Sequence, residues 1–98
     1  MNKENIIKEM EAYRLPDYMQ SCVINYLVKG YQPGIFLYNI LTNNLIGAVT
    51  HADFQNRECL ASWVLFIYNQ FPGIAWGSKQ KVEEWMLKRR EDVRISAT

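Results

Sequence analysis

The chain has 98 residues, of which 49% are hydrophobic and 21% are charged, and this suits one globular domain with its own core. Its formal net charge of +1 excludes a global field that would hold a polyanion or a membrane surface. No stretch approaches the roughly 18 apolar residues of a membrane span, so we expect a cytoplasmic protein without a membrane partner. Aromatic residues make up 13% of the chain, and self-association is an expected way to cover apolar surface that so small a core leaves exposed.

Three helices are expected in the first half of the chain. Residues 3–13 form a short amphipathic helix that ends before Pro16, and residues 16–29 form the next, with Gly30 as its left-handed C-terminal cap. A turn at residues 31–34 precedes a run that is too apolar for a surface helix. We expect that run to be central in the core, and its apolar residues are Ile35, Phe36, Leu37, Ile40 and Leu41.

Two further helices are expected between the middle of the chain and Gln70. Asn44 can cap a short helix that ends near Ala52, and either Asp53 or Asn56 can cap the longer helix that follows. The longer helix is expected to bury Leu60, Trp63, Val64, Phe66 and Ile67.

Two local features leave alternatives open within these two helices. Gly47 weakens the short helix or allows a neighbouring group to approach closely. Residues 63–68 are dense in β-branched and aromatic side chains, so a strand is the rival interpretation there.

The last helix is expected from Lys79 to about Arg90, with Ser78 as its N-cap. Its buried face consists of Val82, Trp85 and Met86. The sequence therefore predicts an all-α fold, a compact single domain of five or six short helices over residues 1–98. Residues 1–4 and 93–98 are expected to be loose.

The segment from Phe71 to Ser78 is the strongest candidate for a binding site. It places a proline, two glycines and Trp76 directly before a helix whose free N–H groups and dipole attract anions. Together with the charges of Lys79 and Lys81, this corner could hold a nucleotide phosphate and stack its base on the indole. In the alternative interpretation Trp76 packs into the core and Ser78 only caps the helix.

A second candidate is a polar cluster that flanks the short helix expected from Leu45 to Ala52. If both ends of that helix share one surface, the cluster could recognise a polar ligand; the alternative is that its members are turn and cap residues. The candidate ligand-binding residues of this cluster are Asn44, Asp53, Asn56 and Arg57.

Catalytic, metal and cofactor sites are not expected. His51 is the single histidine, and a His51–Asp53 pair has neither the further ligands of a metal site nor the partners of a nucleophilic triad. A nucleic-acid partner is also disfavoured, because the part of residues 45–70 that would read a DNA groove is almost wholly apolar after Glu58.

The order of several short motifs resembles a family of small uncharacterised bacteriophage proteins. The likeness extends from Leu15 to Trp85, and Asn44 stands where that family usually has aspartate. The matching residues are Pro33-Gly34-Ile35-Phe36-Leu37, Asn43-Asn44-Leu45, Ala52-Asp53, Asn56, Phe66-Ile67-Tyr68-Asn69, Pro72, Trp76-Gly77-Ser78, Val82 and Trp85.

This resemblance implies a phage or prophage origin and brings no established activity. The expected function is therefore that of a non-enzymatic binding protein that antagonises a host component, by sequestering a nucleotide-like anionic ligand as a counter-defence. The alternatives are an inhibitor that contacts a host or defence protein directly and a small DNA-binding regulator. For the inhibitor, the anchors would be Tyr13, Tyr18, Tyr31, Tyr38 and Trp76 if these side chains are exposed.

Overall fold

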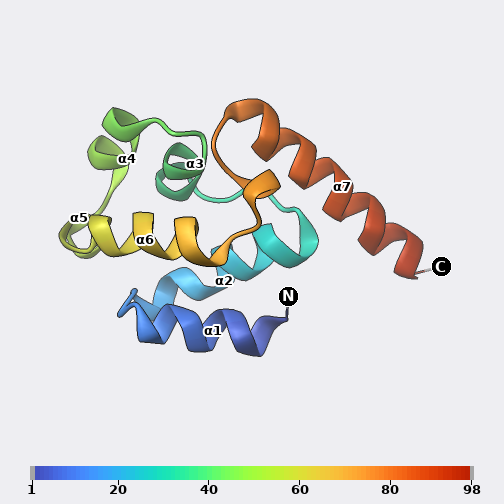
Figure 1. The fold of residues 1–98 in the computed structure, drawn as a ribbon, viewed down its shortest axis with the longest axis horizontal. Helices are drawn as coiled ribbons and strands as arrows, with labels where there is room; N and C mark the ends of the chain where they lie inside the picture. The colour runs from blue at the N-terminus through green and yellow to red at the C-terminus, as the bar shows by residue number, and fades with distance from the viewer. Residues whose placement is uncertain (1, 98) are drawn as a thin grey trace.

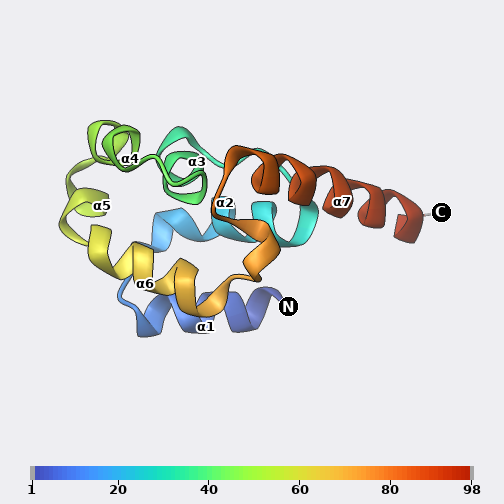
Figure 2. The same cartoon turned by 45° about the horizontal axis from the view of Figure 1, so that its top comes forward.

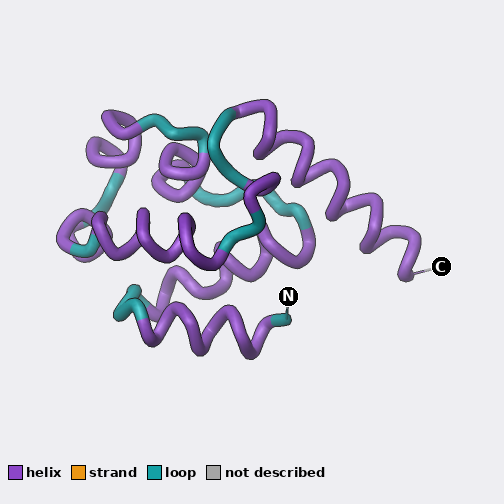
Figure 3. The backbone as a smooth tube through the Cα atoms, in the orientation of Figure 1, coloured by secondary structure: helices purple, strands orange, loops and turns teal. Residues whose placement is uncertain are grey.

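The structure is a computed structural model that describes residues 2–97, and every regular element in that range is helical (Figure 3). This confirms the all-α prediction. The elements in chain order are α1 (Lys3–Ala12), η1 (Asp17–Met19), α2 (Gln20–Ile24), η2 (Asn25–Lys29), α3 (Ile35–Leu41), α4 (Leu45–His51), α5 (Phe54–Glu58), α6 (Leu60–Gln70), η3 (Gly73–Ala75) and α7 (Lys79–Ala97). Residues 2–97 thus contain seven α-helices rather than five or six, because the helix expected to reach Gln70 is divided.

The division lies at Cys59, where φ is −111° and ψ is 28°. The short α5 before it begins at its N-cap Asp53, whose side chain accepts a hydrogen bond from the N–H of Asn56. After the break, α6 covers residues 63–68, so the strand interpretation is wrong. Helical spacing places Trp63, Phe66 and Ile67 in the core, and their burial outweighs the β-propensity of the segment.

The helix expected over residues 16–29 changes its winding along its length. It begins as the 3₁₀ turn η1, continues as α2 and ends as the π-helical turn η2. Gly30 then ends it in the left-handed conformation with φ of 72°, as the sequence predicts. The backbone there is also closely covered, because a Cβ on Gly30 would lie 2.5 Å from the carbonyl oxygen of Met86.

The core is built around a connected series of aromatic rings. Successive ring centroids lie 5.8, 6.1, 5.5 and 6.4 Å apart. The rings, in that order, belong to Phe36, Trp63, Phe66, Phe71 and Tyr26. They come from α3, α6, the segment after α6, and η2, so the series ties together elements that are distant in the sequence. The helices α1 and α6 lie side by side, with α3 and α4 on the other side of α6 (Figure 1).

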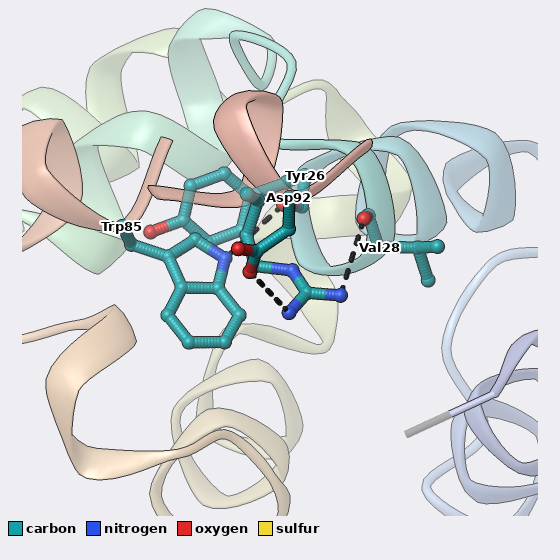
Figure 4. A network of polar contacts seen from close by, with 5 residues as sticks. Tyr26, Val28, Trp85 and Asp92 are labelled. Carbon is teal, nitrogen blue, oxygen red and sulfur yellow. Dashed lines mark hydrogen bonds and ion pairs between the residues drawn. The ribbon is translucent and has the colours of Figure 1, made fainter. Parts of the chain in front are cut away.

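The last helix, α7, packs against the π-helical turn through one polar network (Figure 4). The indole N–H of Trp85 donates to the carbonyl oxygen of Tyr26 at 3.2 Å, and Arg89 donates to the carbonyl oxygen of Val28 at 3.5 Å. Arg89 also pairs with Asp92 at 3.3 Å. The network anchors the middle of α7, while its C-terminal half extends beyond the other helices (Figure 1, Figure 2).

The predictions of which two residues are buried and of where two helices end are wrong, as follows. Ile35, expected in the core, is 64% exposed, and Val64, expected to be buried, is 47% exposed. Helix α7 continues past Arg90 through residues 93–97, which the sequence analysis takes as loose, and α1 already includes residues 3–4. Residues 1 and 98 lie outside the described range.

Candidate functional site

The segment before α7 is held by short-range bonds as well as by α3. Ser78 Oγ accepts a hydrogen bond from the N–H of Lys81 at 3.2 Å, which confirms its role as N-cap. The N–H of Gly77, whose φ is 117°, donates to the carbonyl oxygen of Leu41 at 2.7 Å. The side chains of Lys79 and Lys81 are exposed, so the corner has the two charges that the sequence predicts.

Trp76 is half-buried and lines a cleft between α4 and α6, with the end of α3 at one side. We call this the α4–α6 cleft, and its volume is about 190 Å³. Its lining residues are Ile40, Asn43, Asn44, Leu45, Ala48, Leu60, Val64, Leu65, Ile67, Tyr68 and Trp76. The cleft therefore brings together Trp76 and Asn44, one residue from each candidate site of the sequence analysis.

The other three candidate ligand-binding residues of the polar cluster, Asp53, Asn56 and Arg57, do not line this cleft. Asp53 caps α5 and also accepts a hydrogen bond from Tyr18 Oη at 2.5 Å. Asn56 is buried and accepts from the indole N–H of Trp63 at 3.0 Å. Arg57 donates to the carbonyl oxygen of Ala52 at 3.1 Å. Each of the three thus has a structural partner, as the alternative interpretation of the cluster expects.

Asn44 combines a structural bond with its position at the cleft. Its Oδ1 accepts from the N–H of Gly47 at 3.0 Å, which confirms the predicted cap of α4, and its Nδ2 donates to Asn39 Oδ1 at 3.0 Å. A Cβ on Gly47 would lie 2.6 Å from Asn39 Oδ1. Gly47 therefore allows the close approach that the sequence analysis names as one of its two roles.

The three tryptophans differ in how their indole N–H groups are satisfied. Trp63 donates to Asn56 Oδ1 at 3.0 Å and Trp85 donates to the carbonyl oxygen of Tyr26 at 3.2 Å. The Nε1 atom of Trp76 is buried and has no hydrogen-bond partner among residues 2–97. Its ring instead contacts the ring of Tyr68 edge to face, with centroids 6.0 Å apart. A buried donor without an acceptor costs free energy, and among the three indoles only that of Trp76 carries this cost in the described residues.

The other walls of the cleft are apolar and open to solvent. Leu45 is 66% exposed, Leu65 is 54% exposed and Tyr68 is 66% exposed. None of these three side chains is among the candidate site residues predicted from the sequence. A signal for them exists in the charge pattern, because residues 30–52 and 59–78 contain no Asp, Glu, Lys or Arg, and these two stretches supply every residue of the lining.

The single histidine, His51, contacts a carbonyl oxygen of its own helix, α4. His51 Nδ1 lies 2.9 Å from the carbonyl oxygen of Gly47, one helical turn earlier, and no group of three or more His, Cys, Asp or Glu in the described residues could hold a metal ion. No helix in that range combines the length and apolarity that crossing a bilayer requires.

Comparisons with known proteins place the chain in no family. No protein-family model matches it, and no solved structure matches it. A segment of 64 residues, 65% of the chain, is 30% identical to part of pollen receptor-like kinase 2 of Arabidopsis thaliana. The chain spans 10% of the length of that protein, so this similarity assigns neither a family nor an activity to the chain.

Proposed function

We propose that this protein is a non-enzymatic binding protein whose α4–α6 cleft recognises an uncharged, apolar segment of another protein. The observation that carries the proposal is the cleft itself, an apolar hollow in which Leu45, Leu65 and Tyr68 are each more than half exposed. Exposed apolar groups gathered around one concavity are typical of interaction sites, whereas single exposed leucines are ordinary.

Charge decides the chemistry of the segment that this cleft would bind. The cleft lining contains no Asp, Glu, Lys, Arg or His side chain, so a charged group brought into it would lose water without gaining a counter-charge. Burial of one leucine-sized side chain, by contrast, stabilises a complex by about 1.5–3 kcal/mol. An uncharged apolar segment therefore fits the cleft better than a phosphate or a nucleic-acid backbone.

The resemblance to small bacteriophage proteins supports a host protein as the partner, so we propose direct inhibition of a host or defence protein. Sequestration of a nucleotide by Trp76, Ser78, Lys79 and Lys81 stays a prediction. Two observations argue against it. Trp76 lines a cleft that neither lysine lines, and the N–H of Lys81 already donates a hydrogen bond to Ser78 Oγ.

The test compares two matched surface variants. Leu65→Asp places a carboxylate in the cleft, whereas Leu87→Asp makes the same change at a leucine of α7 that is 63% exposed and lies outside it. A photo-reactive phenylalanine analogue at position 68 would cross-link the partner, and mass spectrometry would identify the cross-linked peptide. We expect the cross-linked peptide of the partner to be uncharged. We also expect the cross-link to be lost with Leu65→Asp and retained with Leu87→Asp. Capture that both variants leave unchanged would refute the proposal.

A further inference from the structure

A second concavity lies on the other side of α6 from the α4–α6 cleft, where α1 runs beside α6 (Figure 1). We call it the α1–α6 groove, and its volume is about 190 Å³. Its apolar lining consists of Ile6, Leu27, Phe66 and Phe71, and its polar lining consists of Asn5, Glu9 and Gln70. No residue lines both the groove and the cleft, so binding in the groove is independent of the proposed function.

The contacts of α1 place Glu9 on the side of that helix that faces α6. Asn5, Glu9 and Tyr13 are spaced four residues apart, so they follow one row along α1 and its C-cap. At the end of this row the ring of Tyr13 contacts the ring of Phe66 edge to face, with centroids 5.6 Å apart. The hydroxyl of Tyr13 also accepts a hydrogen bond from Asn69 Nδ2 at 3.1 Å. The row that carries Glu9 therefore lies against α6.

The groove has an apolar floor and a polar rim. Ile6, Leu27 and Phe71 are buried and form the floor, whereas Asn5 and Gln70 are exposed and form part of the rim. An apolar cavity of about 150 Å³ binds benzene, so a groove of about 190 Å³ has room for one six-membered ring with a small substituent. A ligand has to place an apolar face on the floor, because a group that needs hydrogen bonds finds none there.

Glu9 gives the groove an uncompensated negative charge. It is half-buried, and it is the one charged side chain of the lining. Its carboxylate has no partner within residues 2–97, where the ion pairs join Arg89 with Asp92 and Arg94 with Glu91. Because no Lys, Arg or His lines the groove, charge complementarity favours a cationic ligand and disfavours an anion.

A planar cation suits this combination of floor and rim better than an ammonium ion does. Amidinium and guanidinium groups are flat, and their N–H donors lie in the plane and match the two oxygens of a carboxylate. The guanidinium is also more weakly hydrated than an ammonium, so it loses less when an apolar surface replaces water. The carboxylate of Glu9 and the side-chain carbonyl groups of Asn5 and Gln70 supply acceptors for such donors.

We propose that the α1–α6 groove binds a small, flat organic cation of the amidine or guanidine class. The apolar body of the ligand lies on the floor, and its N–H groups donate to the carboxylate of Glu9. Asn5 and Gln70 accept further hydrogen bonds at the rim. This assigns Glu9 the recognition of charge and the floor the recognition of a flat apolar shape.

The first test compares benzamidine with benzamide, which has nearly the same shape but no charge. Each compound is titrated into ¹⁵N-labelled protein at constant ionic strength. We expect benzamidine to give saturable shifts of backbone amides around the groove, with a dissociation constant of about 1 mM. Benzamide is expected to bind about fivefold more weakly, as the loss of one partly exposed ion pair implies. Equal affinities, no saturation with benzamidine, or shifts confined to the α4–α6 cleft would overturn the proposal.

The second test uses matched variants of α1. Glu9→Gln removes the charge of the groove and keeps the size of the side chain, whereas Glu11→Gln makes the same change at an exposed residue outside the groove. We expect Glu9→Gln to weaken benzamidine binding about fivefold and Glu11→Gln to leave it unchanged. Benzamide should bind Glu9→Gln as it binds the wild type, which shows that the groove is intact. Benzamidine affinity that Glu9→Gln leaves unchanged, or that both variants lower equally, would overturn the role of Glu9 and with it the proposal.

Discussion

Tyr18 Oη donates a hydrogen bond to Asp53 Oδ2 at 2.5 Å and so connects η1 with the N-cap of α5 across 35 positions of sequence. The bond from Tyr18 is the main reason that the pKa of Asp53 lies below its usual value, and the bond from the N–H of Asn56 adds to it. The same bond to Asp53 raises the pKa of Tyr18 to about 12.

Both shifts predict a pH dependence of stability that Tyr18→Phe reduces, leaving the part of the Asp53 shift that comes from Asn56. Because the pKa of Asp53 is lowered by folding, its contribution is present above the unfolded value of about 3.9 and is lost as the pH falls through the folded value. Because the pKa of Tyr18 is raised, its contribution is present below about 10 and is lost as the pH rises towards about 12.

We therefore expect the urea midpoint of the wild type to exceed that of Tyr18→Phe at pH 7, and the difference to shrink at both extremes. Asp53→Asn is the control, because asparagine also caps helices but carries no charge. A difference between wild type and Tyr18→Phe that stays constant from acid to alkaline pH would contradict the linkage.

Gly30 is predicted to be intolerant of a side chain. Its φ is 72°, and a Cβ there would meet the carbonyl oxygen of Met86 at 2.5 Å and Arg89 Cβ at 2.8 Å. Gly30→Ala should lower the free energy of unfolding by about 2 kcal/mol or more, because the left-handed conformation alone costs an alanine about 1–2 kcal/mol. In the matched variant Gly73→Ala nothing lies within 4 Å of the new Cβ, and we expect a change of at most about 0.5 kcal/mol. Equal urea midpoints for the two variants would contradict the close approach of α7.

The buried bond between Asn56 and Trp63 is predicted to stabilise the junction of α5 and α6. Asn56→Ala leaves the indole N–H of Trp63 without its acceptor, and a buried unpaired donor costs about 1–3 kcal/mol. A double-mutant cycle with Trp63→Phe should show a coupling of about 0.5–1.5 kcal/mol in urea unfolding, since the second change removes the donor as well. Strict additivity of the two changes would show that this bond contributes nothing.

Substitution of Ser78 and substitution of the two lysines near it are predicted to have different effects on stability. Ser78→Ala removes the cap of α7 and should cost about 1 kcal/mol of stability, whereas Lys79→Glu with Lys81→Glu should cost much less because both side chains are exposed. If the corner binds an anionic nucleotide, the lysine variant loses that binding in calorimetry while remaining folded. Absence of heat with every nucleotide for the wild type would instead remove the anion hypothesis.

Much of the local structure of this chain follows from its sequence. The caps at Asn44, Asp53 and Ser78 each depend on a hydrogen bond between residues three positions apart, and the left-handed end at Gly30 depends on one glycine. The residues that make such bonds can be recognised without knowledge of the rest of the molecule, and the helical spacing of apolar residues indicates the buried faces of α6 and α7 in the same way. The all-α class and most helix boundaries could therefore be predicted.

The candidate site could be found only from the tertiary structure. Asn44 and Trp76 are both marked by their local sequence, but no local rule places them in one cleft. Whether Val64 and Ile35 are buried depended on which neighbours α6 and α3 meet, and both are exposed. The beginnings of α4, α5 and α7 and the left-handed end at Gly30 follow from local sequence, because the bonds that form them lie within a few residues. Which apolar side chains remain uncovered, and that the indole N–H of Trp76 is buried without an acceptor in the described residues, depend on tertiary packing.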